Sequence, residues 1–436
     1  MLTYDLDKRG STPLYDYLYQ CIRQDIISGR LQAGERLPSK RTLAQHLSVG
    51  IITVANAYAQ LAVEGYITSR EKKGYFVEDV SSYRVRRKAA AAMQPEAAER
   101  EYFADFKANR ISLQNFPLAT WTRLMRETLS VHNEELLKTV PYKGVYELRK
   151  AIAAYLAHNR AMQVDPSQII IGAGTEYLYG RLLQMFGHAC TLAIEEPGYK
   201  KFASISASFG NPWKYIPIDD NGLMIDKLEE SGADVVHLSP ANHFPTGIVM
   251  PVTRRLELFE WVNRIRKRYI IEDDYDSEFR YTGRFILPLY AQDTQSRVIY
   301  MNTFSKSLVP SLRISYMVLP PRLLERYEQT MSFYSCTVSS FEQYTLARFI
   351  SEGYFERHIN KMKNYYREQR HKILAAIHAS PLAAVSQITE RNAGTHFVLH
   401  INTKLTEAEV RKAALAADMS LSFYSDYSHN TEENDG

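Results

Sequence analysis

The residues of this 436-residue chain that could do chemistry stand directly after short apolar runs. Lys306 lies in the hydroxyl-rich string TFSKS, which follows the apolar run 298–300, and Asp273 closes another such run at 269–271. A lysine side chain can bond covalently to a carbonyl carbon. A carboxylate beside a positively charged ring stays ionised, because the opposite charge lowers its pKa. These two residues therefore suit a cofactor that brings an aldehyde and a ring nitrogen into one site.

Pyridoxal phosphate has these two needs, and it also requires donors for its phosphate and an aromatic ring to stack on. The string TFSKSLVPSLRIS resembles the lysine motif of fold-type I aminotransferases. The resemblance implies that Lys306 attaches the cofactor. It also implies that Ser305 or Thr303, together with Arg313, holds the phosphate, to which arginine offers a charge-assisted fork of donors.

The acidic string IEDDYDSEF offers partners for the cofactor ring. We assign Asp273 to the ring nitrogen and Tyr275 to the phenolic oxygen, and Asp274 remains the competing candidate for the nitrogen. An acidic string can also be a solvated loop. Its position directly after an apolar run favours the cofactor role, because ligands of parallel sheets bind at the carboxyl ends of the strands.

Three further segments complete the predicted cofactor set. Gly174 and Thr175 follow an apolar run and open a helix, where backbone N–H groups suit a phosphate. The string EPGY resembles the family element whose tyrosine stacks on the ring, which assigns that role to Tyr199. The string SPANHFPTG resembles the PTG loop near the cofactor, although it has Phe where ordinary aminotransferases have Asn. Asn242 or His243 then reaches the O3′ side of the cofactor, and a purely structural role for His243 stays open.

The elements that must position these residues alternate along the chain from about residue 105 onward. Short β-branched runs, such as 169–171, 235–238 and 269–271, are separated by helix-length gaps. This alternation predicts βα units around a mostly parallel sheet. We therefore expect an α/β domain over 105–436, and the resemblance implies the PLP-dependent fold-type I aminotransferase fold.

A smaller unit precedes this domain, over residues 12–80. Apolar residues at helical spacing predict three short helices, and Gly29 and Gly65 mark the ends of two of them. Two short β-type runs around the polar turn 70–74 predict a hairpin. Helices followed by a hairpin describe a winged helix-turn-helix domain, which we bound at residues 1–80.

The string GRLQAGERLPSKR at 29–41 resembles the signature of the GntR family of DNA-binding proteins. Ser39, Lys40 and Arg41 would hold a phosphate at a helix N-terminus, where N–H groups and cations converge. The third helix would enter the major groove, and the hairpin turn would approach the backbone or the minor groove. The predicted DNA-binding residues are Arg36, Ser39, Lys40, Arg41, Gly50, Thr53, Asn56, Lys72, Lys73 and Gly74.

One departure from the GntR pattern affects base readout. The family usually has Ser-Arg where this chain has Gly50-Ile51, so an expected groove-facing arginine is absent. Either other residues of the helix read the bases, or the protein is less selective for DNA sequence. Two alternatives stay open: Arg36 forms a surface salt bridge, or the winged helix serves only protein contacts.

Residues 81–104 form the predicted linker between the two domains. They combine the basic run RVRRK with an alanine tract and a proline, which is typical of an exposed segment. The basic side chains are either solvated or in contact with the DNA backbone.

Composition narrows the class of protein. Cys21, Cys190 and Cys336 are scattered without CxxC spacing, which argues against a disulfide framework and a structural zinc site and fits a reducing cytoplasm. No run approaches the roughly 20 apolar residues of a membrane span, and the N-terminus lacks the apolar stretch of a signal peptide. A net charge of +4 permits nucleic-acid binding. We expect a cytoplasmic protein without a metal site or a membrane partner.

A GntR-like reader followed by an aminotransferase-like domain is the arrangement of the MocR family, which the chain resembles over nearly its whole length. The resemblance implies a transcription regulator that binds double-stranded operator DNA and pyridoxal phosphate and assembles as a head-to-tail homodimer. Pyridoxal phosphate, or its adduct with an amino acid or amine, would shift the arrangement of the DNA-binding domains. Such a shift requires the ligand to favour one arrangement energetically. We assign no catalytic residue, although residual half-transamination chemistry is compatible with this set.

Two alternatives are a PLP-dependent aminotransferase with a DNA-binding appendage and a DNA-binding protein that has lost the cofactor. Rapid turnover requires a substrate clamp, and no arginine follows Arg411 to provide a second one. Lys201 stands two positions after Tyr199, where sensors of amino acids carry one such arginine, so Lys201 is the predicted effector-binding residue. The chain stops after a polar tail where relatives continue through a strand and a helix, which favours pyridoxal phosphate itself as the signal.

Overall fold

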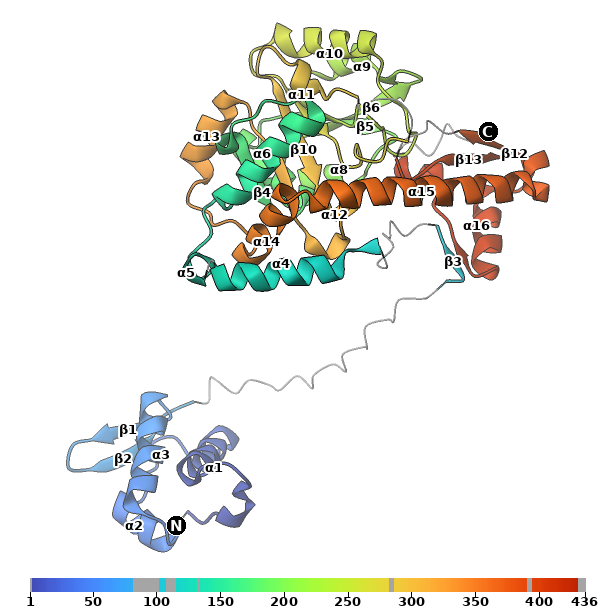
Figure 1. Cartoon of the computed structure of the whole chain (residues 1–436). Helices are drawn as coiled ribbons and strands as arrows, with labels where there is room; N and C mark the ends of the chain where they lie inside the picture. The colour runs from blue at the N-terminus through green and yellow to red at the C-terminus, as the bar shows by residue number, and fades with distance from the viewer. Residues whose placement is uncertain are drawn as a thin grey trace. The chain divides into compact units, whose positions relative to one another are not determined.

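The computed structural model describes residues 2–80, 102–106, 115–131, 133–281, 286–389 and 394–429. Contacts between residues divide the chain into two compact units, Met1–Arg100 and Glu101–Gly436, and each is described by itself (Figure 1). The basic run of the predicted linker lies outside the described residues.

The first unit consists of short helices followed by a hairpin. Its elements are η1 (Leu6–Arg9), α1 (Leu14–Ser28), α2 (Lys40–His46), α3 (Ile51–Val63), β1 (Ile67–Arg70) and β2 (Gly74–Val77). Leu18 and Ile22 lie one turn apart on α1 and share a core with the buried face of α3. Helix α1 ends at Gly29, whose φ of +78° suits glycine. The strands pair antiparallel with Ile67 opposite Val77, and the predicted winged helix-turn-helix is confirmed.

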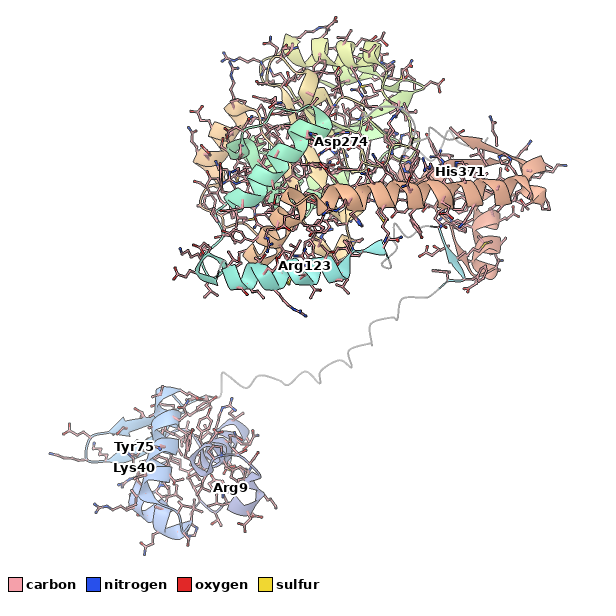
Figure 2. All side chains as sticks on the ribbon, viewed as in Figure 1. Arg9, Lys40, Tyr75, Arg123, Asp274 and His371 are labelled. Atoms are coloured by element: carbon pink, nitrogen blue, oxygen red, sulfur yellow. The ribbon has the colours of Figure 1, made fainter. Side chains whose placement is uncertain are left out.

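The start of α2 lies against the wing, the hairpin formed by β1 and β2. Ser39 precedes α2, and its Oγ accepts a hydrogen bond from the N–H of Thr42 at 3.1 Å. The Nζ of Lys40 lies 5.1 Å from the centre of the Tyr75 ring on β2 (Figure 2). This cation–π contact fixes the first turn of α2 next to the wing.

The second unit is centred on an eight-stranded sheet with the order β4-β11-β10-β9-β8-β5-β6-β7. Its strands are β4 (Ile169–Gly172), β5 (Leu192–Glu196), β6 (Trp213–Asp219), β7 (Gly222–Leu223), β8 (Val235–Leu238), β9 (Tyr269–Asp273), β10 (Val298–Thr303) and β11 (Ser315–Val318). Strands β10, β9, β8, β5 and β6 run parallel, whereas β11 is antiparallel to both neighbours. The prediction of a mostly parallel sheet is confirmed.

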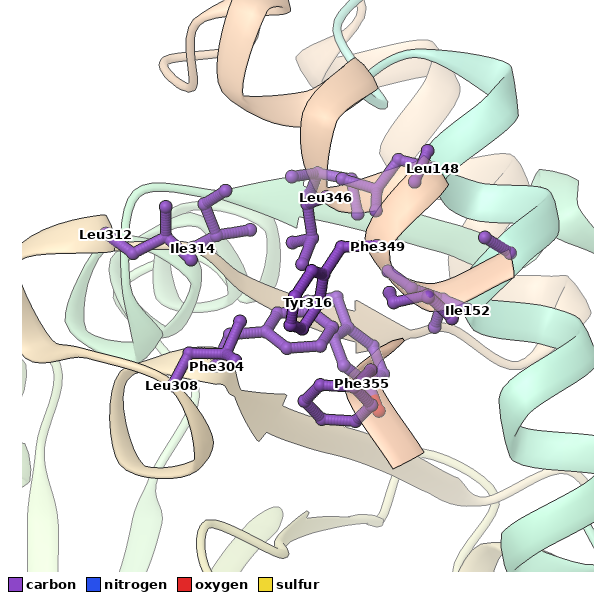
Figure 3. Close-up of a cluster of buried hydrophobic side chains, with 14 of the residues drawn as sticks. Leu148, Ile152, Phe304, Leu308, Leu312, Ile314, Tyr316, Leu346, Phe349 and Phe355 are labelled. Carbon is purple, nitrogen blue, oxygen red and sulfur yellow. The ribbon is translucent and has the colours of Figure 1, made fainter. Parts of the chain in front are cut away.

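Both faces of this sheet are buried, because successive residues of a strand point to opposite faces and helices cover each face. Ile169 and Ile171 of β4 belong to one core cluster, whereas Ile170 belongs to another. In the first cluster, Tyr316 of β11 lies among side chains of other elements, including Phe349 (Figure 3). This explains why the strands read as continuous apolar runs.

Helices surround the sheet, and the longest extends beyond it (Figure 1). The helices of this unit are α4 (Leu118–Val131), α5 (Asn133–Leu136), α6 (Tyr146–Arg160), α7 (Thr175–Phe186), α8 (Lys201–Ser208), α9 (Ile225–Ser231), α10 (Val252–Arg264), α11 (Leu289–Gln292), α12 (Phe304–Ser307), α13 (Pro321–Met331), α14 (Ser340–Ser351), α15 (Tyr354–His378) and α16 (Glu407–Ala416). No helix in the described ranges is long and apolar enough to cross a membrane.

Two small two-stranded sheets include strands from the last part of the chain. Strands β12 (Ser386–Thr389) and β13 (Val398–Ile401) pair antiparallel. Strand β14 (Met419–Ser420) pairs parallel with β3 (Ala104–Asp105). Ala104, the last residue of the predicted linker, therefore lies in a strand of the second unit.

Candidate functional site

The candidate site forms where strands of the large sheet end. Asp273 is the last residue of β9, and Thr303 is the last residue of its parallel neighbour β10. Lys306 follows on α12, one turn beyond the end of β10. Because parallel strands end at the same edge of a sheet, Asp273 and Lys306 come from separate segments to one place.

Lys306 is half-buried, and its environment changes its acidity. Burial lowers the pKa of the Lys306 amine, and the nearby carboxylates of Asp276 and Asp273 act in the opposite direction. A lowered pKa makes the neutral amine available at a lower pH than in an ordinary lysine. The neutral amine is the form that attacks a carbonyl carbon.

Asp273 is buried, with 8% of its surface exposed, and it is incompletely paired. Its Oδ2 lies 3.7 Å from Nε2 of His237, and its Oδ1 has no hydrogen-bond partner among the described residues. Burying an unpaired carboxylate oxygen is costly. The free oxygen therefore suits a cationic N–H donor from a ligand.

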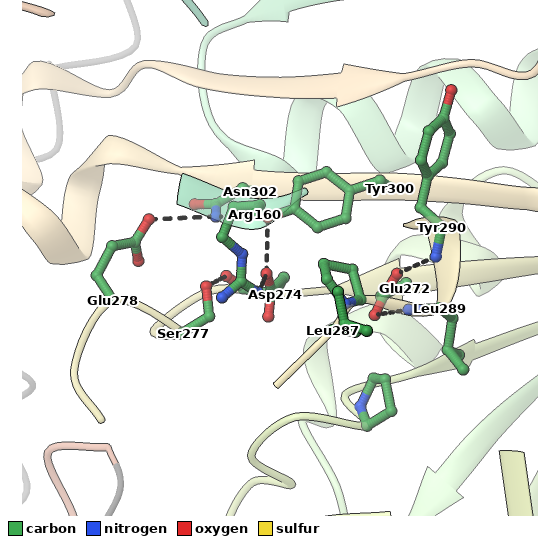
Figure 4. Close-up of polar contacts among 12 residues, drawn as sticks. Arg160, Glu272, Asp274, Ser277, Glu278, Leu287, Leu289, Tyr290, Tyr300 and Asn302 are labelled. Atoms are coloured by element: carbon green, nitrogen blue, oxygen red, sulfur yellow. Dashed lines mark hydrogen bonds and ion pairs between the residues drawn. The ribbon is translucent and has the colours of Figure 1, made fainter. Parts of the chain in front are cut away.

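Asp274, the competing candidate, is engaged in a buried network instead (Figure 4). It forms an ion pair with Arg160, which ends α6, and it accepts a hydrogen bond of 2.6 Å from the hydroxyl of Tyr300. Burial alone would lower the pKa of the Arg160 guanidinium. The nearby Asp274 and Tyr300 raise this pKa by more, so it lies above that of an ordinary arginine. Sequence reasoning missed Arg160, which no motif marks.

Asn242, Tyr275 and Asp276 form a hydrogen-bonded group beside Lys306. The Nδ2 of Asn242 donates to Oδ2 of Asp276 at 2.7 Å, and the hydroxyl of Tyr275 donates to the Asn242 carbonyl oxygen at 3.2 Å. The Oδ1 of Asn242 has no partner within the described ranges. Burial raises the pKa of Asp276 to about 8. Tyr275 and Asn242, predicted for one side of the cofactor, thus come together.

Gly394 touches this group, and sequence reasoning missed it. A Cβ at Gly394 would lie 2.3 Å from Nδ2 of Asn242 and 2.8 Å from Oδ2 of Asp276. Its φ of +70° also disfavours any other residue. The string AGTH was the available signal for this contact, because it combines a glycine, which allows another segment to come close, with a histidine two positions later.

His243 is fully buried and makes local contacts. Its Nδ1 lies 2.7 Å from Oγ1 of Thr246, and its Nε2 lies 3.6 Å from Oε2 of Glu195. Burial lowers the pKa of His243 to about 4, so the imidazole is neutral at pH 7. His396, which sequence reasoning also missed, has a pKa lowered to about 4 by burial and by the charge of Lys306.

The predicted phosphate side lies at the start of α7. Gly174 precedes this helix with a φ of +103° and no side-chain cap, so the first N–H groups are available. A Cβ on Gly174 would lie 2.4 Å from Nη2 of Arg313. Arg313 therefore lies directly against the turn that leads into Thr175. Ser305 has a buried Oγ without a partner among the described residues.

Thr303 is already engaged, since its Oγ1 accepts from Ser315 Oγ at 2.8 Å and from the Ser305 N–H at 3.1 Å. Of the two predicted hydroxyl donors, Ser305 is therefore the one with an unused Oγ. Thr303 ends β10, and Ser305 lies in the first turn of α12, which follows directly.

Glu176 on α7 connects two of the predicted ligand-binding residues. Its Oε1 lies 2.5 Å from Nζ of Lys201, and its Oε2 lies 3.3 Å from Nη2 of Arg313. Tyr199 is 42% exposed, and the Lys201 Nζ lies 5.7 Å from the centre of its ring. Lys201 thus links Tyr199 to Glu176, and Glu176 links Lys201 to Arg313.

The predicted DNA-binding residues lie on the surface of the first unit. Arg41, Gly50, Asn56, Lys72 and Lys73 are among the exposed ones, and Thr53 is half-buried. Arg36 is exposed and pairs with Phe76 in a β-bridge, and its guanidinium lies 3.4 Å from where a Cβ on Gly74 would stand.

The residues at the strand ends fit pyridoxal phosphate. An unpaired buried carboxylate oxygen, an uncapped helix N-terminus beside an arginine, and a lysine of lowered pKa correspond to the ring nitrogen, the phosphate and the aldehyde of that cofactor. In the described part of the chain, no group of three or more His, Cys, Asp or Glu residues could hold a metal ion.

Comparison with known proteins gives the same two-part division. Residues 14–77 match the model of bacterial regulatory proteins, gntR family, and residues 103–421 match that of aminotransferase class I and II. The multiple substrate aminotransferase of Thermococcus profundus superposes with a TM-score of 0.67 at 23% identity, covering 80% of this chain and 90% of that one.

Full-length relatives carry both parts. The HTH-type transcriptional regulator YdeL of Bacillus subtilis is 38% identical over 95% of this chain and 89% of its own. The probable rhizopine catabolism regulatory protein MocR of Rhizobium meliloti is 31% identical over 94% and 86%. The HTH-type pyridoxine biosynthesis regulator PdxR of Corynebacterium glutamicum is 26% identical over 90% and 84%.

The fold and these matches define a DNA-binding transcription regulator, with a GntR winged helix followed by a fold-type I aminotransferase domain. Within that class, the chain belongs to the family of MocR-like HTH-type regulators. Both the family and the fold predicted from the sequence are confirmed.

Proposed function

We propose that this regulator binds pyridoxal 5′-phosphate in its aminotransferase-like domain and uses it to sense a small molecule. The observation that carries the proposal is the buried Oδ1 of Asp273, which lacks a partner among the described residues and belongs to a carboxylate close enough to influence the pKa of Lys306. A protonated ring nitrogen would satisfy that oxygen. When bound, the cofactor supplies an aldehyde carbon that amines attack and a ring that withdraws electrons.

The chain's own residues then have separate roles. Lys306 holds the cofactor through its amine, and Asp273 keeps the ring nitrogen protonated. The other proposed cofactor contacts are Tyr275, Asn242 and His243 on the phenolic-oxygen side, Tyr199 on the ring face, and Gly174, Thr175, Thr303, Ser305 and Arg313 around the phosphate. His243 is neutral at pH 7, so it acts as a hydrogen-bond partner rather than as a charge.

The effector is proposed to enter at the mouth of the site, where Glu176 holds both Lys201 and Arg313. A carboxylate or phosphate brought by a ligand would replace Glu176 as the partner of these cations. The exposed ion pair between Lys201 and Glu176 contributes little to stability, so replacing Glu176 with a ligand group costs little free energy. Two ligands satisfy this description: an amino compound bound at Lys201, or pyridoxal phosphate as the signal itself.

We propose a sensing role rather than an enzymatic one, with domains at 1–80 and 105–436 joined by the linker 81–104, whose last residue, Ala104, already pairs with Met419 in the second unit. A head-to-tail homodimer would let one ligand change the arrangement of two DNA-binding domains, provided the ligand favours one arrangement. The aminotransferase fold and the pair Lys306 and Asp273 are also compatible with partial transamination. The alternative function is therefore an aminotransferase with a DNA-binding appendage. The relatives that match both parts are named as regulators, which supports sensing.

An absorbance titration tests this proposal. The purified full chain is titrated with pyridoxal phosphate, and D- and L-amino acids and amines are then added one at a time. A visible band that one compound shifts supports an amino effector, whereas a band that no amine shifts supports pyridoxal phosphate as the signal. Absence of any band contradicts the proposal, and steady transamination at ordinary enzyme rates favours the aminotransferase alternative.

DNA binding by the winged helix depends on phosphate contacts. Replacing Arg41 with alanine is expected to weaken binding and to reduce the slope of log K against log salt by about 0.9, because one fewer counterion is released. Fluorescence anisotropy with a labelled duplex at several salt concentrations measures this slope. Arg9→Ala, a matched change on η1, should leave the slope unchanged, and an unchanged slope in Arg41→Ala removes Arg41 from the interface.

A further inference from the structure

The open face of α3 has an unusual composition. Val54, Tyr58 and Leu61 occupy the buried face and pack in the core of the first unit. The opposite face of a surface helix is normally charged or polar, yet α3 contains no Asp, Glu, Lys or Arg. Instead, Ile51 and Ile52 in its first turn are 50% and 76% exposed.

The cationic residues lie on neighbouring elements rather than on α3. Arg41 is exposed on α2, and Lys72 and Lys73 are exposed at the tip of the wing. Gly50, at the start of α3, brings no side chain over the first turn of the helix. A DNA duplex has the complementary arrangement, because charged phosphates border the groove and uncharged base edges form its floor.

The residue types on this face match one base pair in particular. Thymine is the only DNA base that presents a methyl group in the major groove, and apolar side chains contact that methyl. Asn56 is exposed one turn after Ile52, and the amide of asparagine pairs with N6 and N7 of adenine. An apolar contact and an amide on one helix face therefore both favour A·T pairs.

The geometry points to an apolar base readout in which Ile51 and Ile52 contact thymine methyl groups of the operator while Asn56 reads an adenine. The inference rests on the DNA-binding function of the winged helix and adds to it the residues that read sequence and the base that they read. It explains how the helix recognises DNA without the arginine that the sequence pattern leads one to expect at Ile51.

The experiment removes the methyl groups from the DNA. A duplex is first selected from a random pool with the full chain, and its affinity is measured at fixed salt. Each thymine is then replaced in turn by deoxyuridine, which keeps the pairing edge and lacks only the 5-methyl group. We expect a loss of about four-fold at each contacted thymine, the factor that corresponds to one buried methyl-sized group.

Variants of the chain link that loss to the two isoleucines. In the double variant Ile51→Ala, Ile52→Ala, the selected duplex should bind more weakly, and the deoxyuridine substitutions should then have no effect. Val63→Ala is the matched control, because Val63 is 84% exposed at the far end of the same helix and should keep the full deoxyuridine loss. All three side chains are at least half exposed, so the fold is expected to survive.

The outcomes separate this inference from the function on which it rests. If deoxyuridine has no effect at any thymine while binding keeps its salt dependence, the inference is wrong and DNA binding stands. If the wild-type chain binds no duplex in a salt-dependent way, the DNA-binding function itself fails. If the double variant changes the oligomeric state in light scattering and keeps the deoxyuridine loss, the patch joins copies of this chain and the inference is wrong.

Discussion

Replacing Lys306 with alanine is expected to abolish the visible absorbance band that pyridoxal phosphate acquires on this protein. The band requires a covalent bond to an amine, and Lys306 is the amine that α12, directly after β10, places near Asp273. Lys306 is half-buried, and burial lowers the pKa of its amine, so the substitution removes a reactive amine rather than a residue of the hydrophobic core. The far-ultraviolet circular dichroism spectrum should therefore stay unchanged. Absorbance spectra recorded during a titration with pyridoxal phosphate measure the effect.

Lys227→Ala provides the control for this experiment. Lys227 is an exposed lysine on α9 that pairs with Glu230 at 2.9 Å, outside the strand ends that form the site. The variant should keep the full band. A Lys306→Ala protein that also keeps the band would mean that another lysine attaches the cofactor.

Replacing Arg160 with alanine is expected to lower the free energy of unfolding by about 3–5 kcal/mol, because the change leaves the Asp274 carboxylate buried without its cation. Arg160 and Asp274 have side chains that are 4% and 1% exposed, so the intact pair is shielded from water. The hydroxyl of Tyr300 still donates a hydrogen bond to Asp274, which offsets only part of the cost of burying the unpaired carboxylate. Chemical denaturation followed by circular dichroism measures the difference.

The double variant Arg160→Met, Asp274→Leu tests the cause of that loss. Replacing both members of a buried ion pair with apolar residues is often neutral. The double variant should therefore be more stable than Arg160→Ala, although it removes more polar contacts. A double variant that is less stable than Arg160→Ala would show that the hydrogen bond from Tyr300, rather than the unpaired charge, dominates.

The sequence was sufficient for features that depend on neighbouring residues. Asp273 and Lys306 could be placed at one edge of the sheet because each follows an apolar run, and parallel strands bring such positions together. The winged helix could be predicted for the same reason, since its helices and hairpin have local signals such as Gly29. The antiparallel direction of β11 had no such signal, because the residue types of a short strand such as SYMV do not depend on the direction in which it pairs.

The sequence was insufficient to predict the site residues that lie far apart along the chain and meet only in the folded structure. Arg160 lies 114 positions before Asp274, and nothing in its own helix distinguishes it from a surface arginine. Gly394 reaches Asn242 from the segment between β12 and β13. Contacts of this kind depend on how helices and strands pack against one another. The spacing of residues along the sequence does not indicate that packing.

The segment that carries Tyr199 is held in place by residues made much later in synthesis. The Oγ of Ser428 donates to Oε1 of Glu196 at 2.9 Å, across 232 positions, and the N–H of Gly198 donates to the carbonyl oxygen of Tyr427. Because domains fold as units while the ribosome elongates the chain, the winged helix is complete long before this anchor exists. A nascent chain therefore completes its DNA-binding domain before the segment that carries Tyr199 can form these contacts.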